Sequence, residues 1–219
     1  MKFSLKVVTS VAMLYFSLLL PSFTHASVYK VSIDTSTLSG TAAQLALDFI
    51  DGGLPNNTIT VSSFATTGTL GATASLGDVT GALPGTVTLG DADFFNEHMA
   101  DILLGTSISF IFTPTANPPD VMSLPDAFSL FLLDPLSGLP LFATTDPTGA
   151  DALFHLDIDD TVGGTLQVFD ATNQEVAVSV ISQNQTVPLP GSLALFSVGF
   201  YAVLAVRRRT LLVWESKRT

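Results

Sequence analysis

Short runs of alternating apolar and polar residues recur along the middle of the chain. Three of them place large apolar residues at every second position: Tyr29, Val31 and Ile33; Ile108, Phe110 and Phe112; Phe154, Leu156 and Ile158. A period of two is typical of a β-strand with one buried face. Gly, Pro, Asn and Asp separate the runs, and these residues favour turns. The pattern predicts many short strands joined by tight turns.

We therefore expect residues 27–186 to form one all-β domain. They contain about nine to twelve short candidate strands, which is typical of an antiparallel β-sandwich, here expected to be jelly-roll-like. Leu139–Thr144 is one of these candidate strands, and Ser182–Gln185 is expected to be a polar linker that follows the last of them. The chain has no cysteine, so the stability of the domain must come from burial rather than from disulfides.

Asp91–Leu104 is the one segment that the sequence predicts to be helical. Asp91 or Asp93 is placed to cap its start. The apolar residues of the segment recur at a spacing of three to four, as on one side of a helix: Phe94, Phe95, Met99, Ile102 and Leu103.

Residues 1–26 have the features of a secretory signal peptide. Lys2 and Lys6 precede the apolar stretch Val7–Leu20, which is expected to form the signal helix. Small residues then lead to Ala26, so signal peptidase is expected to cleave between Ala26 and Ser27.

The C-terminal region combines a proline motif, an apolar run and a basic cluster. The motif consists of Val187, Pro188, Leu189, Pro190 and Gly191. Residues 191–206 are uncharged, and as a helix they would span about 24 Å, which predicts a transmembrane segment. Arg207, Arg208 and Arg209 are expected to stop transfer on the cytoplasmic side, leaving residues 210–219 as a cytoplasmic tail.

This three-part order resembles the PEP-CTERM sorting signal of exported proteins of Gram-negative bacteria, in which Glu usually stands where this chain has Leu189. The resemblance implies processing by exosortase, a membrane protease-transpeptidase, and delivery to the cell envelope, cell surface or extracellular matrix. Proteins with this tail often accompany exopolysaccharide production, so the resemblance implies exopolysaccharide as a partner. Residues 31–38, 68–88 and 144–147 also resemble small PEP-CTERM proteins of unknown function, through Gly and Pro turns that bring no catalytic residues.

The charge of residues 27–186 is one-sided, with eighteen carboxylates and Lys30 as the single basic residue. Such a surface repels phosphate backbones, which excludes nucleic acid as a partner. Divalent cations and neutral sugars remain compatible with it. The same charge also has a simpler interpretation, in which acidic residues keep an exported protein soluble.

The sequence contains no recognisable catalytic set. His98 and His155 are the histidines that remain after signal cleavage, and both are expected at the surface. No Gly-x-Ser-x-Gly motif presents a serine nucleophile. A zinc site lacks ligands, because there is no cysteine and the two histidines are far apart. A pair of catalytic carboxylates, as in a glycosidase, is compatible with the sequence, although nothing in it distinguishes two of the eighteen acids from the others.

The best-clustered acids are Asp157, Asp159 and Asp160, which we expect at the end of a strand. Three hard oxygen ligands in one place suit Ca²⁺, although a solvated turn accounts for the same residues. The sequence thus favours a non-enzymatic, exported structural or adhesive protein of the surface or biofilm matrix, without a required cofactor. The alternative is a Ca²⁺-binding or glycan-binding β-sandwich module.

Overall fold

A computed structural model describes residues 26–53, 57–115, 117, 124–159 and 164–185 of the chain. These residues form twelve strands and one 3-10 turn, η1 (Ser36–Leu38). The strands are β1 (Ala26–Asp34), β2 (Ala42–Ile50), β3 (Thr58–Thr66), β4 (Thr69–Leu76), β5 (Val79–Gly81), β6 (Val87–Gly90), β7 (Phe95–Leu103), β8 (Ser107–Pro114), β9 (Asp126–Leu133), β10 (Phe154–Ile158), β11 (Thr165–Val168) and β12 (Ala177–Gln185). None of the helical segments within the described ranges has the length and apolar character needed to cross a membrane.

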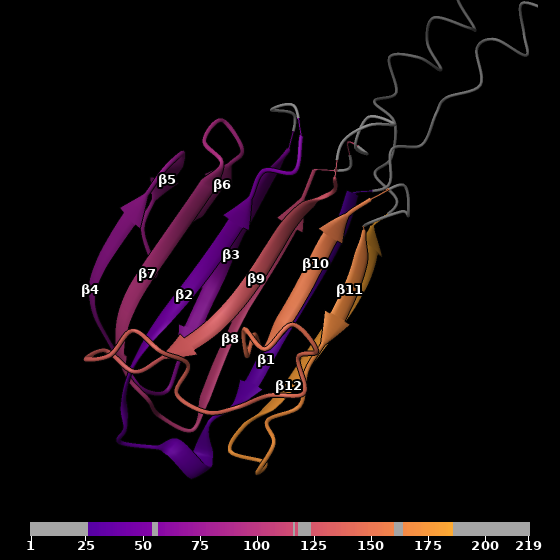
Figure 1. The fold of residues 1–219 in the computed structure, drawn as a ribbon. Helices are drawn as coiled ribbons and strands as arrows, with labels where there is room; N and C mark the ends of the chain where they lie inside the picture. Colours follow the sequence, from indigo (N-terminus) through magenta and orange to yellow (C-terminus); the bar gives the residue numbers. More distant parts are fainter. Residues whose placement is uncertain (1–25, 54–56, 116, 118–123, 160–163, 186–219) are drawn as a thin grey trace, which may run out of the picture. The chain divides into compact units, whose positions relative to one another are not determined.

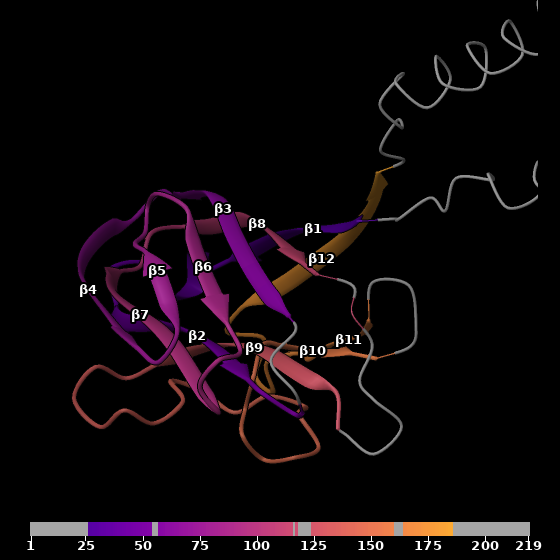
Figure 2. The same ribbon diagram turned by 90° about the horizontal axis from the view of Figure 1, so that it is seen from above.

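The strands form two antiparallel six-stranded sheets that lie one over the other (Figures 1 and 2). Sheet A has the order β12-β1-β8-β3-β6-β5, and sheet B has the order β11-β10-β9-β2-β7-β4. The pairing is nested, because β1 pairs with β8, β2 with β7 and β3 with β6. The all-β, two-sheet architecture expected from the sequence is therefore confirmed.

One hydrophobic core fills the space between the sheets. The inward residues of the alternating runs are buried as expected, and sheet A contributes Tyr29, Phe110 and Phe112 while sheet B contributes Phe128 and Phe154. The ring of Phe112 lies 4.7 Å from that of Tyr29 and 5.3 Å from that of Phe154, measured between centroids. Aromatic rings of both sheets thus pack together at the centre of the domain.

The helix predicted over Asp91–Leu104 is wrong, because this segment contains the nine-residue strand β7, paired with β2 over its whole length. The outward face of β7 alternates apolar and acidic residues: Phe95, Glu97, Met99, Asp101 and Leu103. Its apolar residues therefore recur at every fourth position, which resembles the spacing on one side of a helix. The inward face begins with two buried polar residues, Asn96 and His98, which conceal the period of two.

Buried Asn96 has a structural role that explains its inward position. Its Oδ1 accepts a hydrogen bond from the backbone N–H of Asp78 (2.6 Å), and its Nδ2 donates to the carbonyl of Asp93 (2.7 Å). Gly77, which precedes Asp78, has a positive φ of 77°, and a Cβ there would lie 2.5 Å from Asn96 Oδ1. The amide thus holds two turns at one end of the sandwich.

Two further expectations are corrected. Leu139–Thr144 is not a strand, since it makes isolated bridges from Pro140 to Leu133 and from Thr144 to Ala171. Pro140 has no N–H to continue a ladder. Residues 182–185 are not a linker, because they continue β12 and pair with residues 26–29 of β1. Ser182 and Gln183 are exposed, which is compatible with a strand at the edge of the sheet.

Candidate functional site

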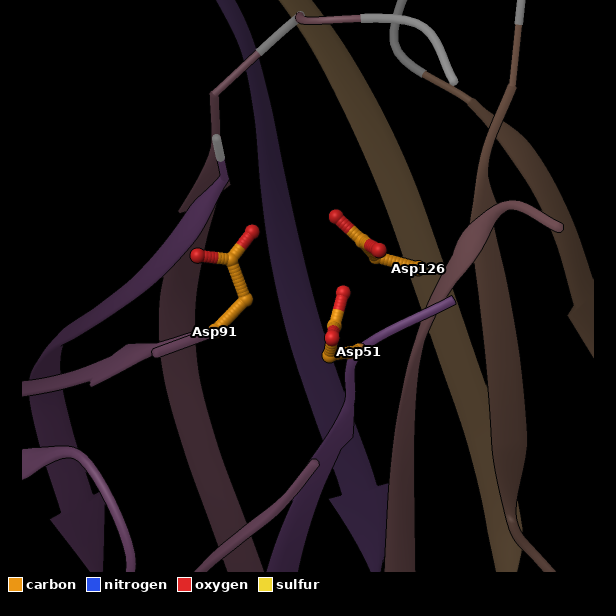
Figure 3. Close-up of side chains that lie close together, drawn as sticks. All are labelled: Asp51, Asp91 and Asp126. Carbon is orange, nitrogen blue, oxygen red and sulfur yellow. The ribbon is translucent and has the colours of Figure 1, made fainter. Parts of the chain in front are cut away.

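Three carboxylates meet at one end of the sandwich, at the ends of strands that are distant in the sequence. Asp51 follows β2, Asp91 follows β6, and Asp126 is the first residue of β9. Each offers an oxygen that lies within 4.8 Å of an oxygen of the other two (Figure 3). Asp91 and Asp126 are buried, and Asp51 is half-buried. We call these three residues the aspartate cluster.

Backbone and amide N–H groups position the aspartate cluster. Asp126 accepts from the N–H of Gly52 (2.8 Å) and from Nδ2 of Asn57 (2.7 Å). The backbone N–H of the buried Asn57 donates to Asp91 at 2.6 Å. Asn57 therefore bridges two of the carboxylates and fixes their separation.

Within the aspartate cluster, the fold makes the charged form of Asp126 unfavourable. Burial raises the pKa of Asp126, and the charges of Asp91 and Asp51 raise it further, while the hydrogen bonds from Gly52 and Asn57 act in the opposite direction. Among the residues that the structure describes, Lys30 on β1 is the one lysine or arginine. Clustered carboxylate oxygens are the ligands that Ca²⁺ and Mg²⁺ prefer.

The acids singled out in the sequence lie elsewhere. Asp157 is on β10, where it accepts a hydrogen bond from His155, and Asp159 follows that strand and accepts one from the hydroxyl of Thr165. Asp160 lies outside the described residues. Within the described ranges, the aspartate cluster is the group of three potential metal ligands that the fold brings together.

Sequence reasoning missed the aspartate cluster because its members are separated by about 40 and 35 residues. Each stands at a strand end beside turn-forming residues, but many aspartates of the chain do so. Only the order of strands in the sheets reveals which of these ends lie together.

The two histidines have different environments. His155 is partly exposed on the outer face of sheet B, between Ser129 Oγ (2.8 Å from Nδ1) and Asp157 Oδ1 (3.0 Å from Nε2). The expectation that His98 lies at the surface is wrong, since it is 1% exposed. Its Nδ1 lies 2.8 Å from Ser75 Oγ, and the N–H of Leu83 donates to Nε2 at 3.4 Å. Burial lowers the pKa of His98, which favours the neutral form of the ring.

Ser129, His155 and Asp157 resemble a catalytic triad in composition but not in setting. Ser129 and His155 are register partners on the inner strands β9 and β10, and Ser129 is buried. Inner strands use their backbone N–H groups in the ladders on both sides, so this face offers no pair of free donors for an oxyanion. The contacts of His155 with Ser129 and Asp157 are better explained as side-chain pairing on the surface of a sheet.

A second pair of carboxylates, Asp48 and Glu97, lies on the outer face of sheet B as register partners on β2 and β7. Burial raises the pKa of Asp48 to about 7, and the charge of Glu97 adds to the effect. Burial also raises the pKa of Glu97. Asp48 Oδ1 is buried and has no hydrogen-bond partner among the described residues.

The targeting residues are only partly described. Ala26 and Ser27, on either side of the expected cleavage site, are the first two residues of β1. The motif Val187–Gly191, the arginines 207–209 and the expected helices at both ends lie outside the described residues. A scan of protein-family models, a search of curated proteins and a search of solved structures each find no match to this chain.

Proposed function

We propose that this chain is an exported protein of a Gram-negative bacterium whose β-domain has a structural or adhesive role at the cell surface or in the extracellular matrix. One observation carries the proposal. The described domain begins at Ala26 and ends at Gln185, which are register partners of β1 and β12. Ala26 is the last residue of the expected signal peptide and Gln185 precedes the expected motif at Val187, which supports a domain between the two expected targeting signals.

In this proposal, signal peptidase and exosortase are the processing enzymes, and the C-terminal helix provides a membrane anchor before processing. The domain then has no enzymatic activity, and exopolysaccharide is its proposed environment. The nested strand pairing supports a jelly-roll-like arrangement of the sandwich. The excess of carboxylates is in keeping with a soluble exported surface that does not bind nucleic acid.

Fractionation tests the export proposal. In a Gram-negative host that contains exosortase, we expect the mature chain to begin at Ser27 and to reach the cell surface or medium. Replacing Arg207, Arg208 and Arg209 with glutamine removes the cationic stop, so we expect the variant to lose that destination.

The matched control replaces Lys217 and Arg218 with glutamine, which removes basic residues of the tail but leaves the stop intact. Retention of both variants and the unmodified chain in the inner membrane would indicate a plain anchor. An intact N-terminus inside the cell would contradict export itself.

Divalent-cation binding by the aspartate cluster is the second candidate function. The observation that favours it is the burial of two of three adjacent carboxylates in a stretch of chain without basic residues. Burial of a charged group is costly, and a bound cation offsets that cost. Asp51, Asp91 and Asp126 would supply hard oxygen ligands, which favours Ca²⁺ or Mg²⁺ over softer metals.

We expect Ca²⁺ to raise the free energy of unfolding, by about 2.7 kcal/mol at a hundredfold excess over its Kd. Thermal unfolding with and without Ca²⁺, together with calorimetric titration, measures this effect. Asp51→Asn is expected to abolish it, because the substitution removes one charged ligand while the turn can remain.

Two control variants sharpen this experiment. Asp93→Asn removes an exposed carboxylate two residues from Asp91 and is expected to leave Ca²⁺ binding unchanged. Asp157→Asn tests the site suggested by the sequence. Loss of binding in Asp157→Asn but not in Asp51→Asn would assign the cation to β10, and absence of heat in the unmodified chain would reject the second candidate.

A further inference from the structure

Among the described strands four lie at sheet edges, and three of these carry features that discourage pairing with another chain. β5 and β11 are only three and four residues long. β4 is longer, but its pairing with β7 shifts register between Leu70 and Thr73. Short edges and irregular edges are two ways in which natural sheets avoid adding a further strand.

β12 lacks all of these features. It is nine residues long, and its register with β1 is regular from Ala177 to Gln185. The strand contains no charged residue and no proline, so nothing in its sequence interrupts a further ladder. No described strand pairs with its outer edge, since β12 is terminal in sheet A. Its middle residue, Ile181, is 57% exposed.

We propose that β12 pairs antiparallel with β12 of a second copy of this chain, around a two-fold axis at Ile181. Self-pairing places Ile181 opposite Ile181 of the second copy, and Ser179 opposite Gln183 of the second copy. The two copies of sheet A then form one continuous sheet. Such an interface is isologous and closes at a dimer, which is the commonest symmetric assembly.

The charge distribution favours a second copy as the occupant of this edge. Two copies of a domain with eighteen carboxylates repel each other over most approaches. The repulsion is weakest along β12, because the strand is neutral and because Lys30, the one basic residue of the domain, is the register partner of Ile181 on β1. Each copy also supplies a neutral nine-residue strand of matching length. This inference goes beyond the proposed function and does not depend on export.

Cross-linking at single cysteines tests the interface, since the full chain has no cysteine of its own. We expect purified full-length Ile181→Cys in mild detergent to form dimers with a short bismaleimide, because the residue meets its own copy on the axis. An equimolar mixture of Ser179→Cys and Gln183→Cys is expected to form more cross-links than either variant alone. Leu136→Cys, at a fully exposed loop position, reports random collisions, and Leu76→Cys reports the β4 edge.

Sedimentation of the same chain provides an independent measurement. We expect a monomer–dimer equilibrium in which Ile181→Lys raises the Kd roughly tenfold or more, because two ammonium groups would face each other between two Lys30 side chains. Leu76→Lys, an equally exposed substitution on β4, is expected to leave the Kd unchanged. The proposal is overturned if Ile181→Cys cross-links no better than Leu136→Cys, if Leu76→Cys cross-links best, or if the Kd does not respond to Ile181→Lys.

Discussion

Replacing Phe112 with alanine is expected to lower the free energy of unfolding by about 3 to 5 kcal/mol. Phe112 is fully buried on β8 of sheet A, and its ring contacts aromatic rings of both sheets. The centroids of Phe112 and Phe128 are 5.2 Å apart, in addition to the closer contacts with Tyr29 and Phe154. Alanine would leave a cavity where the sheets meet, and the chain has no disulfide to limit the loss.

Denaturant unfolding followed by circular dichroism measures this effect. The matched control is Phe94→Ala, which removes the same side chain from a position that is 73% exposed and is expected to change stability by less than about 0.5 kcal/mol. Equal losses in the two variants would show that the aromatic contacts between the sheets do not hold the sandwich together.

The second large effect concerns the Asp48–Glu97 pair. Burial and the neighbouring carboxylate raise the pKa of Asp48 from its ordinary value of 3.8 to about 7 in the folded chain. The folded state therefore binds this proton more tightly than the unfolded state does. The contribution of Asp48 to stability is greatest below about pH 4 and is lost as the pH rises from about 4 to 7.

We expect Asp48→Asn to remove most of this pH dependence. At pH 8 the unmodified chain carries an unfavourable buried charge, so the variant should be more stable by on the order of 2 to 4 kcal/mol. Near pH 4 the two proteins should differ little. The free energy of unfolding, measured by denaturant titration at several pH values between 4 and 8, tests this expectation.

Asp101→Asn is a suitable control for this experiment, because Asp101 lies on the same outward face of β7 and is likewise half-buried. It accepts a hydrogen bond from Gln44 and does not face Asp48. We expect it to keep the pH slope of the unmodified chain. An unchanged slope in Asp48→Asn would show that the carboxylate pair does not control the pH response.

Strands with one apolar face could be predicted from local pattern alone. The runs around Val31, Phe110 and Leu156 alternate because a pleated strand exposes successive side chains to opposite faces, and these residues are buried as expected. β7 was missed for a physical reason. Its inward residues Asn96 and His98 are polar, and each accepts a hydrogen bond from the backbone of a segment distant in the sequence. The inward positions therefore lacked the alternating apolar residues on which a strand prediction depends.

The candidate site could not be found in the same way. Three carboxylates become a potential cation site only when the last residues of β2 and β6 and the first residue of β9 lie at one place, and no local pattern encodes that arrangement. The sequence pointed instead to Asp157, Asp159 and Asp160, because proximity along the chain was the one measure of proximity that it offered.

By itself, the sequence determined that this chain forms short antiparallel strands around an aromatic and aliphatic core, since period and burial are linked by the geometry of a single strand. It also determined the acidic, cysteine-free character of the domain. Only the tertiary structure decided which strands are neighbours, which carboxylates share a site and which edge is left long, regular and neutral. These features depend on contacts between residues far apart in the chain, whose positions become related only when the two sheets close on one core.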